Sequence, residues 1–158
     1  MDVIDTLNVR PATEQDLATL RHFEQLIVAA ERPFDPTLRD AGVHYYDLER
    51  MLQQANVRLL VAESGDERIG CGFARIDAVP ARYKHARQAY LGLMYVDPRF
   101  RGRGVNQRLL DELLAWCRTH GITELRLEVY AGNTSALRAY EKAGFNGHLL
   151  EMRLALDA

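Results

Sequence analysis

The sequence predicts a mixed α/β fold built on one sheet, antiparallel in its first half and completed by one parallel crossover. A β-hairpin is expected where the apolar stretches 57–62 and 69–77 flank the turn pair Gly65-Asp66. The near-continuous apolar run 88–96 is typical of a central strand that is covered on both faces. A helix and an alternating stretch at 124–130 follow that run, and a strand–helix–strand unit joins two parallel strands right-handedly.

The N-terminal third is expected to hold a short strand and two helices. Residues 7–10 favour a strand, and Thr13 followed by Asp16 resembles a capping box that starts a helix. A second helix is expected over residues 43–53. Between the two helices, prolines break the segment 31–36 into a rigid, irregular loop of the kind that often carries binding groups.

Glycines and basic residues interrupt the middle of the chain. Gly70 and Gly72 weaken the second hairpin strand and suggest close packing or a bulge there. A polar loop at 79–87 then gathers the basic residues Arg82, Lys84, His85 and Arg87.

The C-terminal third is expected to hold two helices and a last strand. Apolar side chains recur in steps of four along the first helix, at Val105, Leu109, Leu113 and Cys117. Asn133 is suited to cap a second helix that ends at Ala143. Residues 150–156 alternate between apolar and polar, so we expect a last strand, whose edge could form a homodimer.

Length and composition predict a single domain over residues 1–158. The 47% hydrophobic and 27% charged residues are ordinary for a globular protein, and the net charge of −2 gives no general attraction to nucleic acid or an anionic membrane. The sequence contains neither a signal-peptide pattern nor a stretch of about 20 apolar residues, so we expect a cytoplasmic protein. Cys71 and Cys117 fall at apolar positions and are expected to be buried thiols.

The segment between the central strand and the third helix predicts an anion-binding loop. Gly102 and Gly104 allow positive φ and close approach of a ligand to the backbone, and the helix that starts there offers free N–H groups. Three arginines, Arg99, Arg101 and Arg103, add donors that suit phosphate oxygens. These features together predict a cradle for a pyrophosphate.

Two common nucleotide-binding loops do not fit this segment. A Walker A loop needs Lys and then Ser or Thr after its second glycine, whereas Gly104 is followed by Val105, Asn106 and Gln107. A dinucleotide fingerprint needs a third glycine near position 107 and a strand that runs directly into the turn. In this chain, position 107 is Gln, and five residues separate the strand from Gly102. A kinase-like, NTPase or dinucleotide-binding function is therefore disfavoured.

The loop does resemble the acetyl-coenzyme A site of the GNAT superfamily of N-acetyltransferases, whose pattern is Gln/Arg-x-x-Gly-x-Gly/Ala. Residues 101–106, Arg-Gly-Arg-Gly-Val-Asn, occupy these six places, and Asn106 departs from the usual Gly or Ala. An upstream Leu-x-x-Met-Tyr-Val-Asp-Pro strand ending at Pro98 extends the likeness. So does a downstream motif formed by Asn133, Ala136, Tyr140, Gly144 and Phe145.

The resemblance implies a fold, a cosubstrate and a set of binding residues. The fold would be α/β (mixed α+β), with a twisted, mostly antiparallel central sheet and helices on both faces. Acetyl-CoA would be the cosubstrate, no metal is expected, and a backbone N–H of Met94 or Tyr95 would face the thioester carbonyl. The expected cofactor-binding residues are Met94, Tyr95, Val96, Arg101, Gly102, Arg103, Gly104, Val105, Asn106, Gln107 and Asn133.

The resemblance also assigns the proton chemistry in part. Tyr140 matches the tyrosine that protonates the leaving thiolate, and a phenol stays protonated at neutral pH because its pKa is about 10. The general base stays open, since residues 91–93 have no carboxylate where many family members place a glutamate. Ordered water is one candidate for this role, and the others are Glu31, Asp35, Tyr90 and His85.

The leading hypothesis is an N-acetyltransferase that moves the acetyl group directly to a primary amine of a small molecule or peptide in a ternary complex. The alternative is a non-catalytic sensor or regulatory module that binds CoA, suggested by Asn106 and the missing strand carboxylate. Glu31 and Asp35 could attract a cationic acceptor, whereas the basic loop 79–87 could attract an acidic one. The acceptor therefore stays open among amino acids, polyamines, aminoglycosides and peptide N-termini.

Overall fold

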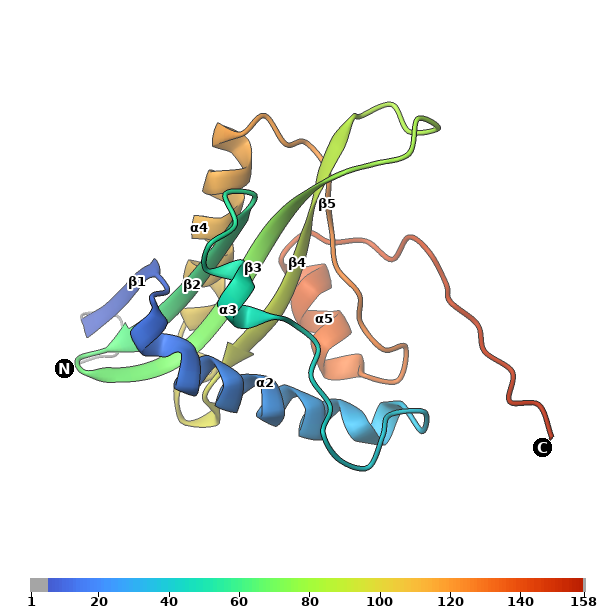
Figure 1. The fold of residues 1–158 in the computed structure, drawn as a ribbon, viewed down its shortest axis with the longest axis horizontal. Helices are drawn as coiled ribbons and strands as arrows, with labels where there is room; N and C mark the ends of the chain where they lie inside the picture. Colours follow the sequence, from blue (N-terminus) through green and yellow to red (C-terminus); the bar gives the residue numbers. More distant parts are fainter. Residues whose placement is uncertain (1–5, 158) are drawn as a thin grey trace. The chain divides into compact units, whose positions relative to one another are not determined.

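The computed structural model describes residues 6–157, and the chain forms two compact units, Met1–Glu128 and Val129–Ala158. The first unit contains the sheet with the helices that cover it, and the second contains one helix and the C-terminal tail (Figure 1).

The first unit is built on a five-stranded sheet whose strands follow one another in chain order. They are β1 (Leu7–Pro11), β2 (Val57–Ser64), β3 (Glu67–Ala78), β4 (Arg87–Val96) and β5 (Leu125–Arg126). The first four pair antiparallel, and β4 pairs parallel with β5. The predicted fold class, with its hairpin and its parallel crossover, is therefore confirmed.

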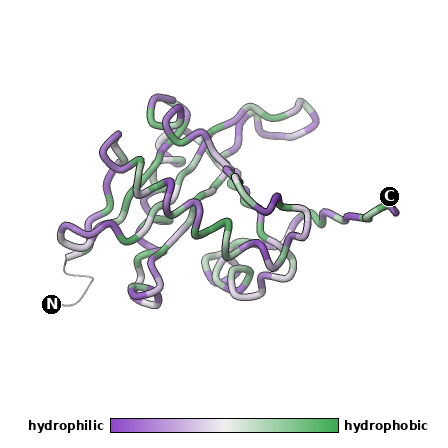
Figure 2. The backbone as a smooth tube through the Cα atoms, turned by 60° about the horizontal axis from the view of Figure 1, so that its bottom comes forward, coloured by the Kyte–Doolittle hydropathy of each residue, from purple (hydrophilic) through white to green (hydrophobic). Residues whose placement is uncertain are grey.

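Helices cover both faces of this sheet. Successive β3 residues point to opposite faces, so the contacts of two neighbouring residues show which helix covers each face. Phe73 packs in a core with residues of α2 (Leu17–Glu31) and α3 (Leu48–Met51). A Cβ built on the neighbouring Gly72 would lie 3.5 Å from Leu113 of α4 (Val105–Thr119) on the other side. Buried apolar residues recur along α2 and α4 between exposed polar ones, so each helix presents one apolar side to the sheet. Hydrophobic and hydrophilic stretches accordingly follow one another along the backbone in Figure 2.

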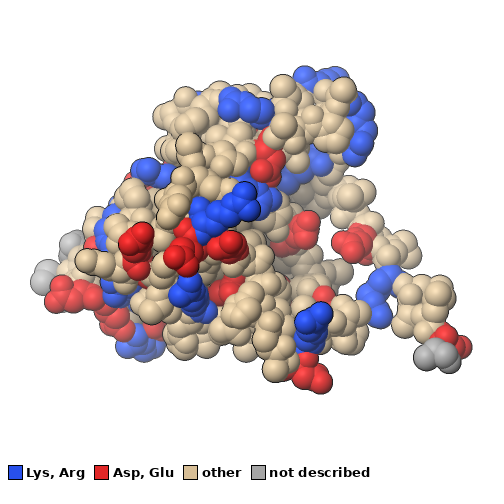
Figure 3. Space-filling view, in the orientation of Figure 1, with Lys and Arg blue, Asp and Glu red and all other residues tan. Residues whose placement is uncertain are grey.

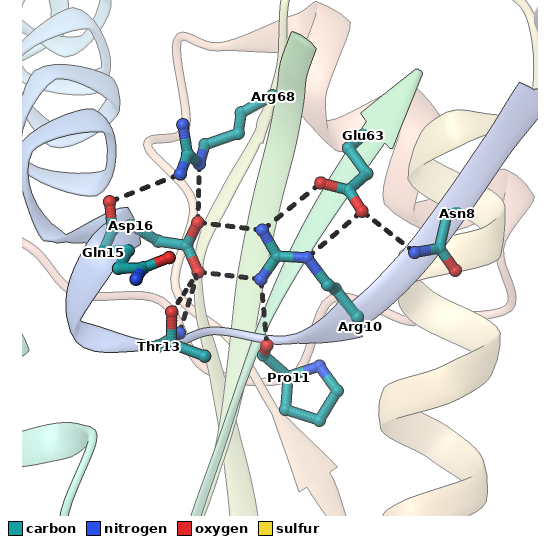
Figure 4. A network of polar contacts seen from close by, with 8 residues as sticks. All are labelled: Asn8, Arg10, Pro11, Thr13, Gln15, Asp16, Glu63 and Arg68. Carbon is teal, nitrogen blue, oxygen red and sulfur yellow. Dashed lines mark hydrogen bonds and ion pairs between the residues drawn. The ribbon is translucent and has the colours of Figure 1, made fainter. Parts of the chain in front are cut away.

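A buried carboxylate fixes the start of α2 against the sheet. Asp16 is fully buried and binds the guanidinium of Arg10 at 2.8 and 2.9 Å and that of Arg68 at 2.5 Å (Figure 4). Its side chain also accepts the backbone N–H of Thr13 at 2.8 Å, in keeping with the predicted capping box. The hydrogen bonds from Arg10 hold the pKa of Asp16 well below its usual range.

Two predicted elements in the first unit are much shorter than expected. The helix predicted over 43–53 is reduced to α3, because the backbone N–H groups of Tyr45 and Tyr46 bind the Glu24 side chain instead of an earlier helical carbonyl. The strand predicted over 124–130 pairs with β4 only at β5. The first of these errors arises from a contact between residues that are about twenty positions apart in the sequence.

The second unit contains α5 (Thr134–Lys142) and a tail without regular structure. Asn133 caps α5 as predicted, because its side chain accepts the N–H of Ala136 at 3.3 Å. The last strand predicted at 150–156 is wrong, since no ladder forms there and its apolar side chains are exposed. Alternation of this kind reports amphipathic character but supplies no neighbouring strand, so the homodimer expected at that edge stays a prediction without a strand to support it.

The two cysteines are fully buried, as predicted. Burial raises the pKa of both thiols, to about 11 for Cys117. Among residues 6–157, no helix combines the length and the apolar content that crossing a bilayer would require.

Candidate functional site

The central strand β4 contains a β-bulge halfway along its length. The register of the β3–β4 ladder shifts at Gly72, where Leu93 and Met94 stand together opposite this one glycine. Leu93 adopts a φ of 54°, a left-handed conformation that a side chain rarely takes. A Cβ on Gly72 would collide with the sulfur of Met94, so the glycine makes room for the second bulged residue. The predicted irregularity at this glycine is therefore present.

Buried groups hold the bulge in its strained conformation. The Cys71 thiol donates a hydrogen bond to the Leu93 carbonyl at 3.2 Å, and the Leu93 side chain is only 3% exposed. The backbone of Leu93 also binds the hydroxyl of Tyr46. Because left-handed backbone at a non-glycine residue costs about 1–3 kcal/mol, the surrounding contacts have to compensate for it.

Beyond the first half of β4, the sheet opens. The β4–β5 ladder consists of Ala89 opposite Leu125 and Tyr90 opposite Arg126, and it ends there in the part of the chain that the structure describes. The remaining six residues of β4, 91–96, therefore have a strand partner on one side only. An edge of this kind offers backbone donors and acceptors to an extended ligand.

The direction of the backbone groups along this edge follows from one hydrogen bond. The N–H of Asp97 donates to Ile69 on β3 at 2.7 Å. Successive N–H groups of an extended strand point to opposite sides, so those of Val96 and Met94 are directed away from β3, toward the open edge. The carbonyl of Val96 accepts a hydrogen bond from Nε of Arg101 at 3.0 Å.

The edge leads directly into the glycine loop. Asp97 accepts the N–H of Arg99 at 2.9 Å and starts a short 3₁₀ turn, η3 (Pro98–Phe100). Gly102 and Gly104 follow with φ of 74° and 81°, values that glycine adopts without strain. Gly104 is the N-cap of α4 and leaves the first-turn N–H groups of this helix without a side-chain cap. Nothing lies within 4 Å of a Cβ built on either glycine, so the start of α4 is open to an anion.

The three arginines of the loop have different surroundings, although the sequence suggested one shared role. Arg99 forms ion pairs with Asp97 and Glu67, which ties the loop to the β2–β3 turn. Arg101 folds back onto Val96 through its Nε. Arg103 is exposed, and no ion pair or hydrogen bond of its side chain is found among the described residues. Arg99 is therefore the arginine whose charge is already paired with carboxylates.

The first residues of α4 divide between packing and exposure. Val105 is 1% exposed and packs below Gly70, whose Cβ position lies 3.6 Å from the Val105 methyl group. Gln107 donates to Asp111 at 2.8 Å, so its side chain points along the helix and away from the loop. Asn106 is half-buried. The backbone of these residues is therefore better placed than their side chains to meet a ligand.

On the α2 side of the sheet, a buried glutamate holds a tyrosine-containing segment in place. Glu24 is 1% exposed and accepts the backbone N–H groups of Tyr45 and Tyr46 at 3.1 and 3.0 Å. It also contacts Nδ1 of His44 at 3.3 Å. Sequence reasoning missed this residue, although a carboxylate four positions after Leu20 on the apolar stripe of a helix was a usable signal.

Tyr46 connects that segment to the bulge. Its ring meets Phe73 edge-on at 4.9 Å, and its hydroxyl lies 2.8 Å from the position of a Cβ on Gly92. The Tyr46 hydroxyl bonds that of Tyr90, and burial is the main reason why the pKa of both phenols is raised. Two protonated phenols therefore lie beside the bulged backbone at neutral pH.

The charges of Glu31 and Asp35 act on this group, since Glu31 contributes to raising the pKa of Tyr46 after the larger effect of burial. Burial raises the pKa of Glu31, and the charge of Asp35 adds to the effect. The Tyr45 hydroxyl is buried without a hydrogen-bond partner among the described residues, and both carboxylates contribute to raising its pKa. Asp35 itself accepts the N–H of Thr37 at 2.9 Å.

The remaining predicted residues are His85, Tyr140 and Asn133. His85 bonds Gln88 at 3.0 Å and stacks on Tyr83 in the turn between β3 and β4. In the second unit, the ring of Tyr140 meets Phe145 edge-on at 5.8 Å, and Asn133 caps α5. Contact of these two residues with the glycine loop stays a prediction.

Comparison with known proteins gives concordant results. Residues 23–145 match the family described as Acetyltransferase (GNAT) family. Over 59 residues, 37% of this chain, the sequence is 42% identical to the [ribosomal protein bS18]-alanine N-acetyltransferase of Salmonella typhimurium, and the match spans only 40% of that relative. It is 29% identical over 121 residues to the IAA acetyltransferase of Azospirillum brasilense, covering 77% of this chain and 74% of the relative.

The fold is shared with a solved structure of a predicted acetyltransferase from Clostridium acetobutylicum that contains acetyl-CoA. The TM-score is 0.71 at 19% identity, with 94% of this chain and 96% of the other chain covered.

Proposed function

The chain belongs to the acetyltransferase (GNAT) family, and we propose that it transfers an acetyl group from acetyl-CoA to a primary amine of a small molecule or peptide. The observation that supports this most strongly is the continuity of three features: the bulge at Leu93, the open edge after Tyr90, and the uncapped start of α4. An extended ligand with an anionic end fits this path, because the edge supplies backbone partners and the helix supplies N–H groups for the anion.

The residues along this path suit acetyl-CoA. Met94 and Val96 direct their N–H groups to the open edge, where the pantetheine arm would bind. Gly102, Gly104 and Arg103 present backbone and guanidinium donors to the pyrophosphate. The other proposed cofactor-binding residues are Tyr95, Arg101, Val105, Asn106, Gln107 and Asn133.

When bound, acetyl-CoA supplies an acetyl group that is activated as a thioester. Of the two residues suggested as the oxyanion donor, Met94 directs its N–H to the open edge and would donate to the oxygen on which negative charge develops during transfer, whereas the same alternation turns the N–H of Tyr95 toward β3. The strained backbone at Leu93 fixes the direction of these groups before any ligand arrives, so no reorganisation is needed during the reaction.

The two proton transfers of the reaction are assigned to different residues. Tyr140 would give its phenolic proton to the departing thiolate. Glu31 is the preferred candidate to receive the proton of the amine, since its raised pKa makes it a stronger base than an ordinary glutamate, and Asp35 would help to hold the cationic acceptor. The acetyl group then passes directly to the amine in a ternary complex.

The test combines binding and turnover. Calorimetry should detect acetyl-CoA binding, and a thiol-release assay with a panel of amines should detect turnover above buffer. Binding without release for every amine would instead identify a CoA-binding sensor.

A matched pair of variants tests the loop. Gly104→Val and Gly121→Val place the same side chain at φ values of 81° and 70°, at opposite ends of α4. We expect at least a tenfold loss of acetyl-CoA affinity for the first and none for the second. Equal affinities would contradict the proposed position of the pyrophosphate.

A further inference from the structure

We propose that the acceptor carries a carboxylate several bonds away from its reacting amine, and that Arg75 and Arg50 bind this carboxylate. The inference rests on the proposed acetyl transfer, to which it adds a class of acceptor: ω-amino acids and short peptides. It follows from a pocket beside the bulge, from the unused guanidinium donors in this pocket, and from the distance between these donors and the bulge.

The pocket lies between α3 and β3 in the first unit and has a volume of about 290 Å³. It is lined by Tyr45, Tyr46, Asp47, Arg50, Met51, Gln54 and Arg75. Two of these residues, Tyr45 and Tyr46, belong to the segment that Glu24 holds in place. Because Tyr46 also touches the bulge, the pocket shares a wall with the proposed site of acetyl transfer.

Arg75 projects into this pocket with part of its hydrogen-bonding capacity unused. Its Nε donates to the two carboxylate oxygens of Asp77 at 3.0 and 2.9 Å. Its guanidinium lies 5.2 Å from the ring centre of Tyr90, which limits the positions it can adopt. Within residues 6–157 the two terminal nitrogens make no hydrogen bond, and such a pair of N–H donors matches the two oxygens of a carboxylate.

The unused N–H donors of the pocket favour an anion. Its lining contains two guanidinium groups, and the carboxylates of Asp47 and of Asp77, which is paired with Arg75, balance their charge. Asp47 is engaged as the N-cap of α3, where it accepts the N–H of Arg50 at 3.2 Å. The Arg50 side chain is exposed and forms no ion pair in the described part of the chain. On the face shown in Figure 3, acidic and basic side chains lie next to one another over much of the surface, and a group of basic side chains stands apart at the upper right.

The strand register gives the separation between the two charged ends of the acceptor. Arg75 stands opposite Tyr90, three residues before the bulge at Leu93. At about 3.3 Å per residue this is about 10 Å along the strand. An α-amino acid is too short to reach both places, whereas an amine with a carboxylate five or six bonds away can do so with the help of the flexible arginine side chain.

A matched set of acceptors tests the proposal directly. 6-Aminohexanoate, 6-aminohexanamide and hexylamine share an amine and a similar chain, and only the first carries a negative charge. Because a charge-assisted hydrogen bond contributes about 1.5–3 kcal/mol, we expect kcat/KM for the acid to exceed that for the amide by about tenfold to a hundredfold. The effect should appear mainly in KM, since the carboxylate is remote from the reacting atoms.

Two variants locate the effect. Arg75→Met should reduce the acid-to-amide ratio of kcat/KM to near one, and Arg50→Met should reduce it partly. Arg58→Met is the control, because Arg58 on β2 pairs with Ala74 and thus belongs to the opposite face of the sheet. Its ratio should equal that of the wild type. Circular dichroism and the Tm of each variant establish that the fold is intact.

The outcomes separate this inference from the proposed function. Equal kcat/KM for acid and amide in the wild type, or an unchanged ratio in Arg75→Met, would overturn the carboxylate site while acetyl transfer stands. If acetyl-CoA binds but none of the three amines and no other amine of the wider panel releases thiol, the proposed acetyl transfer itself fails, and the acceptor site fails with it.

Discussion

Glu24 gives the sharpest test of how the acceptor side is built. Its Oε2 accepts two backbone N–H groups, from Tyr45 and Tyr46, in a fully buried position. Glu24→Gln keeps the shape and one carbonyl oxygen, so both bonds can form but lose their charge assistance. Since charge-assisted hydrogen bonds are about twice as strong as neutral ones, we expect a loss of about 1–2 kcal/mol in the free energy of unfolding.

Glu24→Ala removes the acceptor altogether and leaves two buried N–H groups without partners. Each such group costs about 1–3 kcal/mol, so the expected loss for the two is about 2–6 kcal/mol. Gln25→Ala is the matched control, because Gln25 donates to Val43 of the same segment at 2.8 Å but is exposed. Its effect should stay within about 1 kcal/mol.

Urea denaturation followed by circular dichroism measures these values, and steady-state kinetics measures the functional effect. In Glu24→Gln the KM for the amine should rise severalfold, because the segment that carries Tyr45 and Tyr46 is loosened. The KM for acetyl-CoA should not change, because the glycine loop belongs to another part of the sheet. Equal, small losses of stability for Gln and Ala would refute the idea that this carboxylate organises the segment.

Three other changes have defined outcomes. Asp16→Asn should lower stability at neutral pH and weaken the loss of stability in acid. The depressed pKa of Asp16 stabilises the fold above the unfolded value of about 3.9, and this contribution is lost as pH falls further. Urea titrations between pH 2 and 7 measure both effects. Tyr140→Phe should reduce kcat about a hundredfold with unchanged acetyl-CoA affinity, and normal turnover would exclude its role as the acid. Gly72→Val should destabilise the fold by about 1–3 kcal/mol, because its side chain meets Met94 at the bulge; a Tm equal to that of the wild type would show that the bulge tolerates a Cβ.

Sequence patterns were sufficient where the structure depends on neighbouring residues. The turn pair at Gly65 and Asp66 joins β2 and β3 as expected, because a hairpin is specified by its own turn and alternation. The glycines at 102 and 104 take the positive φ that their position suggested. Local rules of conformation were enough in both cases.

The same patterns failed where distant residues compete for a backbone group. Nothing in residues 43–53 reveals that Glu24, about twenty positions earlier, binds two of their N–H groups and prevents a helix. Arg99 could not be separated from its neighbours in the loop until Glu67 was placed beside it. The pocket at Arg75 likewise depends on two segments, residues 45–54 and β3, that only the fold brings together.

The missing side-chain cap at Gly104 has a consequence for the helix that follows it. A glycine N-cap leaves the first-turn N–H groups without a side-chain partner, and the helix gives up roughly a few tenths of a kcal/mol that a serine or aspartate in that place would provide. An anion binds these N–H groups better than water does, because the helix dipole favours negative charge. Under the proposed function, binding of acetyl-CoA would therefore also order the opening turn of α4 and make the folded protein more stable.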